Sequence, residues 1–192
     1  MIAKHNKTAS LVTAALTLAG KQGWTAVTPT SLAKTAKTTT KEAAAFLASP
    51  AQTMRAIADH VTTTAQRDYR HDPRNSPREA LFEILMLRVD VLQRHRAGFL
   101  ALHDAARHDP RLATAIAQAL YPQTGALLRA AHMTTGAPES IMIRAGLSLI
   151  YGATLCVWRR DATPDMAKTM ATLDRNLHRA ENLMRFMERR TG

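Results

Sequence analysis

Basic and hydroxyl side chains gather near the start of the chain. Six of the seven lysines fall within residues 1–41, and this segment contains no Asp or Glu. Lysines, together with Ser and Thr hydroxyls, are groups that hold the phosphates of a nucleic acid. We therefore expect this segment to bind a polyanion.

Residues 28–47 place these groups on a candidate helix-turn-helix. Two short helices, at 29–36 and 40–47, are expected on either side of a turn at Lys37-Thr38. In such a unit the second helix enters the major groove of DNA. A small helical hairpin with a solvated cationic face is the alternative. The predicted DNA contacts are Lys4, Lys7, Thr28, Thr30, Lys37, Thr38, Thr39, Thr40 and Lys41.

Other reactive side chains form no complete site. Within the His and Asp cluster at 103–109, only Asp104 and His108 have the i, i+4 spacing of a helical metal pair, so we expect surface or pocket-lining residues. Asp161 and Asp165 are expected to flank the start of the last helix, where the helix dipole favours negative charge. No glycine-rich elbow or phosphate loop is found. We predict no enzyme activity, no metal and no cofactor.

Composition narrows the fold class and the partners. With 192 residues, 46% of them hydrophobic and only 5% aromatic, the chain favours helix over sheet and is long enough to bury a core. The net charge of +11 indicates nucleic acid or an anionic membrane surface as partner, with an acidic protein as a further alternative. We expect an all-α protein.

Two features bear on the compartment. The single Cys156 rules out an internal disulfide framework, so we expect a reducing compartment and a cytoplasmic protein. The uncharged apolar stretch 145–158 has fourteen residues and falls short of the roughly twenty that span a bilayer. We expect no transmembrane segment.

Prolines preceded by good N-cap residues mark the starts of several helices. Ser76 with Glu79 and Thr39 with Glu42 also have the spacing of capping boxes. Pro122 is expected to kink the helix that contains it. The predicted helices, about nine, are 8–22, 29–36, 40–47, 50–71, 77–96, 98–107, 110–134, 138–160 and 164–189.

The helix at 138–160 is apolar on every side, so we expect it to be buried on several sides. One of its faces carries only small residues, which lets another helix approach closely, and a second subunit is a candidate for that contact. The predicted dimer interface is Ala145, Ser148, Gly152, Cys156, Met170, Leu173 and Leu177. A ligand pocket is expected among Phe82, Leu85, Val89, Leu92, Phe99, Met142, Tyr151 and Trp158, with a filled core as the alternative.

The stretch from Leu11 to Ile57 resembles the N-terminal helix-turn-helix of TetR-family regulators. The quoted residues are Ala14-Ala15-Leu16, Gly23-Trp24, Thr28, Leu32-Ala33, Ala36, Phe46-Leu47, Ser49 and Met54. The resemblance implies a homodimer that binds a palindromic operator through its N-terminal heads. It also implies a divergent body with an inducer pocket, and an interface formed by the last two long helices.

The chain departs from that family at the turn and in the second helix. Members usually have Gly where this chain has Lys37, and a left-handed turn costs a non-Gly residue roughly 1 kcal/mol. Alanines occupy 43–45, where members carry a Gly-Thr/Ser-Leu-Tyr run and an aromatic pair. Glu42 repels phosphate unless it serves its own cap or accepts from a cytosine amino group. We expect affinity to come mainly from phosphate contacts.

The other end has a second resemblance. Tyr151 to Trp158, Asp161, Pro164-Asp165, Thr169, Leu173-Asp174-Arg175 and Leu177, through Phe186, are similar to the C-terminal pattern of the ubiquinone-biosynthesis lipid-binding family. That family shares the TetR fold, and its members bind isoprenoid lipids and partner enzymes instead of DNA.

These observations predict two domains and two candidate functions. Residues 1–48 are expected to form a helix-turn-helix DNA-binding domain, and residues 49–192 a helical ligand-binding and dimerisation domain. The first candidate is a TetR-type regulator, a repressor that senses a small apolar or lipid-like molecule. The alternative is a lipid-binding accessory protein of ubiquinone biosynthesis, with no operator.

Overall fold

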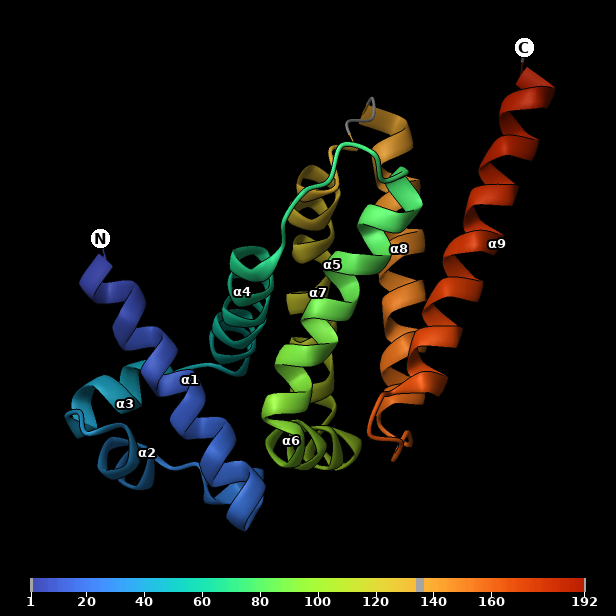
Figure 1. Ribbon diagram of the computed structural model, residues 1–192. Helices are drawn as coiled ribbons and strands as arrows, with labels where there is room; N and C mark the ends of the chain where they lie inside the picture. The colour runs from blue at the N-terminus through green and yellow to red at the C-terminus, as the bar shows by residue number, and fades with distance from the viewer. Residues whose placement is uncertain (1, 134–136, 192) are drawn as a thin grey trace. The chain divides into compact units, whose positions relative to one another are not determined.

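The computed structural model describes residues 2–133 and 137–191, with side chains for 7–133 and 141–186. Across this described part the chain forms nine α-helices, one short 3-10 helix and no strand (Figure 1). The all-α prediction is confirmed.

The observed helices follow the predicted boundaries closely. They are α1 (Ile2–Gln22), η1 (Trp24–Ala26), α2 (Pro29–Ala36), α3 (Thr40–Phe46), α4 (Pro50–Asp68), α5 (Pro77–Arg94), α6 (Arg96–His108), α7 (Pro110–Ala130), α8 (Ala137–Trp158) and α9 (Ala167–Thr191). Four of these helices, α2, α4, α5 and α7, begin at a proline, where the missing N–H costs no hydrogen bond. Helix α7 continues through Pro122.

The last helix begins three residues later than predicted. Pro164 lies in a turn, and Met166 adopts a left-handed conformation with φ 54° before α9 begins at Ala167. The amide of Ala167 donates to Thr163 Oγ1 and to Asp165 Oδ1, both at 3.2 Å. Side chains that the proline pattern did not reveal therefore set the start of α9.

The contacts divide the chain into two compact units. The first comprises residues 1–64 and 90–123, and the second comprises residues 65–89 and 124–192. The predicted domains, 1–48 and 49–192, divide the chain by function, and that division stays a prediction.

Helix α1 is buried on two faces within the first unit. On one face, Leu11, Ala14, Ala15 and Leu18 pack with residues of α2 and α3. On the other, Val12 and Leu16 pack with residues of α4, α6 and α7. The helix-turn-helix therefore shares a core with α1, and α1 shares another with three further helices.

The crossing of α1 and α6 requires a glycine. A Cβ atom at Gly98 would lie 2.3 Å from the carbonyl oxygen of Leu16, closer than real Cβ contacts. Only a residue without a side chain allows the two helices to approach this closely.

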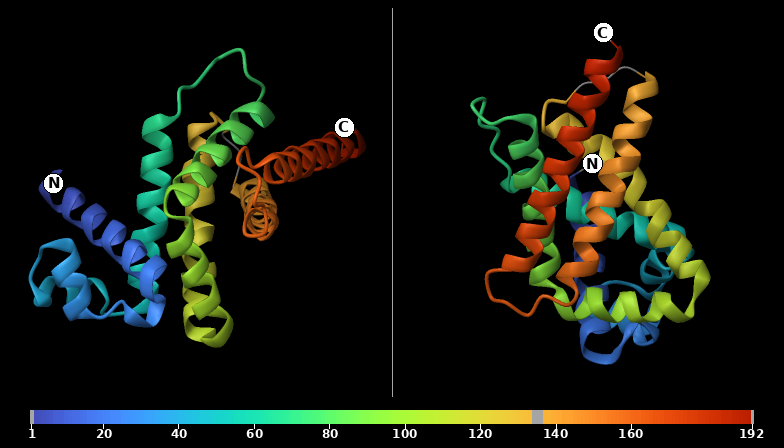
Figure 2. Two further views of the ribbon diagram at one scale, coloured as in Figure 1. Left: turned by 60° about the horizontal axis from the view of Figure 1, so that its bottom comes forward. Right: turned by 90° about the vertical axis from the view of Figure 1, so that its right-hand side faces the viewer.

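In the second unit, α8 and α9 run side by side and are joined by residues 159–166 (Figure 2). Asp161 is buried in this connection. One carboxylate oxygen accepts from the amide and hydroxyl of Thr163, and the other from the amide and hydroxyl of Thr169. The hydroxyl of Thr163, and then the donors of Thr169, hold the pKa of Asp161 well below its usual range. Asp161 therefore connects the end of α8 to the first turns of α9.

Replacing Gly98 with Ala should lower the free energy of unfolding by about 1–3 kcal/mol, the usual cost of overpacking a core. The added methyl group collides with the backbone of Leu16 and forces α6 away from α1. Urea unfolding at neutral pH measures the change.

Gly146→Ala is the matched control, because no atom lies within 4 Å of a Cβ atom at Gly146 in α8. Its stability should stay the same or rise, since Ala is favoured over Gly in helices by up to about 1 kcal/mol. Equal stability of the two variants would contradict the close approach of α1 and α6.

Candidate functional site

The turn between α2 and α3 has the geometry of a helix-turn-helix connection. Lys37 ends α2 in the left-handed conformation, with φ 53° and ψ 49°. The amide of Thr38 donates to the carbonyl oxygen of Ala33 at 3.0 Å, which closes the turn. The expected left-handed turn at a non-glycine residue is confirmed.

Both short helices begin with capping boxes. The hydroxyl of Thr39 accepts from the amide of Glu42, and the Glu42 carboxylate accepts from the amide of Thr39, as predicted. A second box, between Thr28 and Ser31 at the start of α2, was not predicted. The sequence signal was present, but a Ser in place of the usual Glu or Gln made it weaker.

Glu42 also connects α3 to α1. Its carboxylate pairs with the ammonium group of Lys7 and accepts from the hydroxyl of Thr38. These two donors, with Lys7 the stronger, lower the pKa of Glu42 to about 2. The carboxylate thus stays ionised while its charge is balanced by Lys7. Sequence reasoning found the cap but not this ion pair, whose partners are 35 residues apart.

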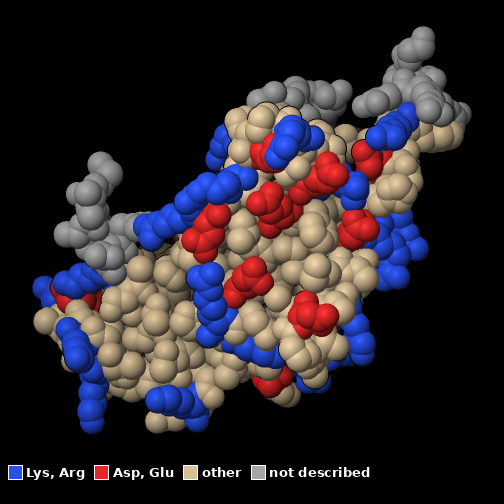
Figure 3. Space-filling model, viewed as in Figure 1, with Lys and Arg blue, Asp and Glu red and all other residues tan. Residues whose placement is uncertain are grey.

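The predicted DNA-contact residues divide into two groups. Thr30, Lys37, Thr40 and Lys41 are exposed, whereas Thr28, Thr38, Thr39 and Lys7 take part in the caps and in the ion pair. Lys4 belongs to α1 but lies outside the described side chains. On the face shown in Figure 3, blue side chains project singly from α1–α3, while most Asp and Glu lie over α5 and α9.

The His and Asp cluster at 103–109 forms no metal site among the described residues. Asp104, His108 and Asp109 are exposed, and the carboxylate of Asp109 accepts from the amides of Arg111 and Leu112. Asp109 therefore caps the start of α7.

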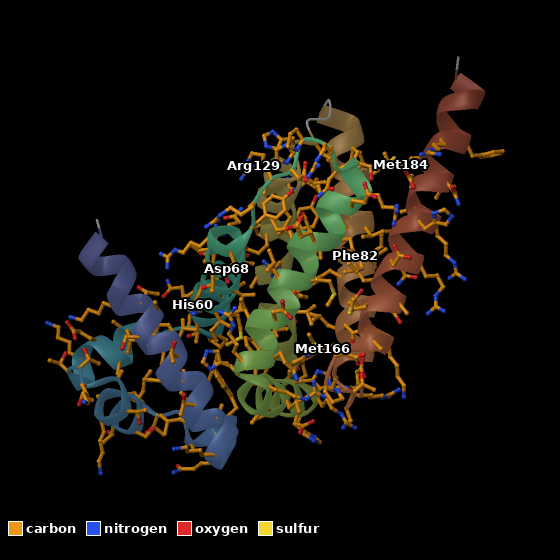
Figure 4. The ribbon with its side chains drawn as sticks, in the orientation of Figure 1. His60, Asp68, Phe82, Arg129, Met166 and Met184 are labelled. Atoms are coloured by element: carbon orange, nitrogen blue, oxygen red, sulfur yellow. The ribbon has the colours of Figure 1, made fainter. Side chains whose placement is uncertain are left out.

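The predicted pocket residues differ in burial. Leu85, Val89, Leu92, Tyr151 and Trp158 are buried, and Phe82 and Phe99 are partly buried. Leu92 and Phe99 belong to the first unit and the rest to the second, where Figure 4 marks Phe82 on α5. The structure places Met142 differently from the prediction, because 66% of this residue is exposed.

A buried cation lies beside one of the pocket residues, Tyr151. Arg88 on α5 is 1% exposed, and its guanidinium carbon lies 4.9 Å from the centre of the Tyr151 ring. This distance is typical of a cation–π contact. Sequence reasoning missed Arg88, although it is spaced with Ile84 and Leu92 on the inward stripe of α5. The region is therefore less purely apolar than predicted.

The expectation that α8 is buried on several sides is wrong for the described single chain. Ile141, Met142 and Leu149 are 60%, 66% and 76% exposed. By length and composition alone, the segment Ile141–Trp158 could cross a membrane, and 22% of it is buried.

One face of α8 carries a seam of Met142, Ala145, Leu149, Gly152 and Cys156, all of them exposed except the half-buried Gly152. Their spacing alternates between three and four residues, as in helices that pack along a seam. No atom lies within 4 Å of a Cβ atom at Gly152, so the seam is open along its middle. Ser148 is half-buried, and its hydroxyl donates to the carbonyl oxygen of Arg144.

On α9 the predicted interface residues have different surroundings. Met170 is exposed, whereas Leu173 and Leu177 are buried within the chain. A residue that is already buried has little surface left for a partner. We therefore assign Leu173 and Leu177 to the core of the second unit.

The arrangement of helices is similar to that of a solved structure. A TetR transcriptional regulator from Rhodococcus sp. RHA1 superposes with a TM-score of 0.56 at 18% sequence identity, over 90% of this chain and 95% of that chain. The chain has the TetR fold. At this identity the likeness concerns the fold alone.

Comparison of the sequence with models of protein families gives a match to a different family. The model of the COQ9 family matches residues 143–184, which correspond to most of α8, the Asp161 connection and most of α9. This match supports the ubiquinone-biosynthesis resemblance of the C-terminal part. No curated protein matches the chain.

Replacing Glu42 with Gln should loosen the packing of α1 on α3, because a neutral amide loses the ion pair with Lys7. We expect a lower melting temperature at pH 7 and faster amide hydrogen exchange in residues 7–46. Glu42 has a lowered pKa in the folded state, so its stabilisation is complete above its ordinary value of 4.5 and is lost as pH falls toward about 2. The difference between the variant and the wild type should disappear over that range.

Glu79→Gln is the control, because Glu79 forms a capping box with Ser76 that stays within α5. It should leave hydrogen exchange in residues 7–46 unchanged. Equal exchange of this segment in both variants would show that the Lys7 pair does not hold α3.

Proposed function

We propose that the protein is a TetR-type DNA-binding regulator, acting as a repressor that responds to a small ligand. The observation that carries the proposal is the exposed basic face of α2, the turn and α3. Lys37 and Lys41 are exposed there, and the nearby carboxylate of Glu42 is balanced by Lys7. Such a face attracts DNA phosphates, and the TetR fold supports this reading.

The proposed mechanism needs two heads. Two recognition helices fit successive major grooves when they are about 34–36 Å apart, one turn of DNA, and their operator is then palindromic. A ligand that binds one head separation better than the other shifts the population between them. The packing of α1 against both the helix-turn-helix and α6 supports such coupling, because the head cannot move independently of α1.

The second head comes from a second copy of the chain. The open seam on α8 supports a homodimer, because apolar side chains at three- and four-residue spacing suit a second helix. Ala145, Gly152 and Cys156 of the predicted interface belong to this seam, and Met170 on α9 is exposed as well.

The proposed ligand is small and mainly apolar. Leu85, Val89, Tyr151 and Trp158 supply the apolar and aromatic surface, and Arg88 lies against Tyr151. We place the protein in the cytoplasm, where a DNA-binding repressor acts.

The alternative is a lipid-binding accessory protein of ubiquinone biosynthesis. The COQ9 family match over residues 143–184 favours it. Few side chains on α3 can form hydrogen bonds with bases, since alanine carries no hydrogen-bonding group. This also favours the lipid-binding alternative. In this reading the body binds an isoprenoid lipid and the head has no operator.

A gel shift with the DNA that flanks the protein's own gene separates the two functions, together with mass spectrometry of any co-purifying lipid. A retarded band that resists competition by unrelated DNA supports the regulator. An isoprenoid lipid without a specific band supports the accessory protein.

Phosphate contacts make a quantitative prediction for DNA binding. The logarithm of affinity should fall with the logarithm of salt, with a slope near 0.9 per phosphate neutralised. Lys37→Ala and Lys41→Ala should each lower that slope by about one and weaken all sequences equally. Fluorescence anisotropy with a labelled duplex at several salt concentrations measures the slope.

Lys168→Ala is the control for net charge, because Lys168 is exposed on α9. It should leave the slope unchanged. If Lys37→Ala and Lys41→Ala together leave DNA binding as it was, the helix-turn-helix is not a DNA-binding element, and the lipid-binding function is the better assignment.

Gly152→Leu should convert the dimer to folded monomers. The open space at Gly152 lets one chain accept the larger side chain, whereas a second helix packed on the seam would be pushed away. Sedimentation velocity at micromolar concentration measures the assembly, and circular dichroism confirms that the variant folds.

Ala113→Leu, at an exposed position of α7, is the control and should remain dimeric. A monomeric wild type at this concentration would rule out the dimer. A dimeric Gly152→Leu variant would place the interface elsewhere.

A further inference from the structure

The outward face of α3 has a simple composition. Thr40, Lys41, Ala44 and Ala45 are exposed, and their spacing places them on neighbouring rows of one helix. Ala43 is fully buried in the core that α1 shares with α2 and α3, and Phe46 packs against the same core. A groove that receives α3 therefore meets three methyl-bearing side chains and one ammonium group.

The carboxylate of Glu42 is engaged by other groups of the chain and contributes little to this face. Its carboxylate oxygens are occupied by Lys7, by the hydroxyl of Thr38 and by the amide of Thr39. With three donors already bound, this carboxylate has little capacity left to accept from the amino groups of cytosine or adenine. The one acidic residue of α3 thus supports the head and leaves base reading to its neighbours.

The major groove offers one apolar group to such a face. Thymine presents its C5 methyl group there, and alanine or threonine methyl groups are suitable contacts for it. Asn and Gln, the residues that pair with adenine through two hydrogen bonds, do not occur on α3. Lys41 carries the only charged hydrogen-bond donor of that face, and its proposed partner is a phosphate, which carries no sequence information.

We infer that this head selects duplexes by their thymine methyl groups, which Ala44 and Ala45 contact. This inference rests on the proposed DNA-binding function and names its ligand class as thymine-rich major groove. Selectivity then comes from methyl contact, while the phosphate contacts supply most of the affinity.

The test replaces thymine with deoxyuridine, which keeps base pairing and phosphate charge but lacks the methyl group. A duplex enriched from a random pool by the wild-type protein is synthesised in both forms, and both affinities are measured at one salt concentration. We expect about a fourfold loss for each methyl contact removed, the value of burying one such group, and about sixteenfold for two.

Protein variants assign the effect to α3. The double variant Ala44→Ser and Ala45→Ser should bind the thymine and deoxyuridine duplexes with affinities that differ by less than twofold. Ala117→Ser, at an exposed position of α7, should keep the wild-type ratio. Thermal unfolding of each variant confirms that the head is folded, and the wild-type comparison of the two duplexes needs no variant.

The outcomes are distinct. Equal wild-type affinity for the two duplexes overturns methyl reading while DNA binding stands. A deoxyuridine penalty that persists in the double serine variant removes Ala44 and Ala45 from the readout. If no duplex is enriched and none binds, the proposed function fails, and the inference fails with it.

Discussion

The double burial of α1 is the constraint on which the functional reading of this fold depends. One face of the helix completes the core of the helix-turn-helix, and the other packs with α4, α6 and α7. Because Gly98 lets the α6 backbone reach the carbonyl oxygen of Leu16, this contact has little freedom to slide. Any displacement of α6 must therefore move α1, and α1 carries α2 and α3 with it because it shares a core with them.

Whereas α1 is buried on two faces, α8 has apolar surface that the single chain does not cover. Leu147, Tyr151, Thr154 and Trp158 are buried, but the seam that includes Leu149 is open to solvent. Burying apolar surface contributes about 25 cal/mol per Å², so an exposed apolar seam favours association. The seam's regular spacing and small residues are the features on which the proposed homodimer rests.

Local rules predicted most of the fold, because the signals that end helices are local. Proline at the first helical position, the Thr39–Glu42 box and the left-handed turn at Lys37 all depend on residues within four positions of one another. Where the structure depends on contacts between residues farther apart in the chain, the sequence was less informative. At the junction of α8 and α9, Asp161 accepts from Thr169 eight residues away, a contact that the proline pattern did not reveal.

The candidate site shows the same division. The exposure of Lys37 and Lys41 could be read from the pattern, whereas the pairing of Glu42 with Lys7 requires the tertiary contact of α1 with α3. Burial caused the other differences. Periodicity places Arg88 on an inward stripe but does not predict that it lies on Tyr151, and it cannot tell that Met142 is exposed while Leu173 is enclosed.

The ion pair of Glu42 also bears on the choice between the two functions. A carboxylate at a helix N-terminus is already stabilised by the helix dipole, and the pairing with Lys7 in addition offsets its negative charge on the basic face. Here that carboxylate serves the cap and is balanced by Lys7, while Lys37, Lys41 and Thr40 remain exposed. A surface whose negative charge is neutralised and whose positive charges are outward attracts phosphate. The C-terminal similarity to lipid-binding proteins concerns α8 and α9, so it bears on the body and leaves this property of the head intact.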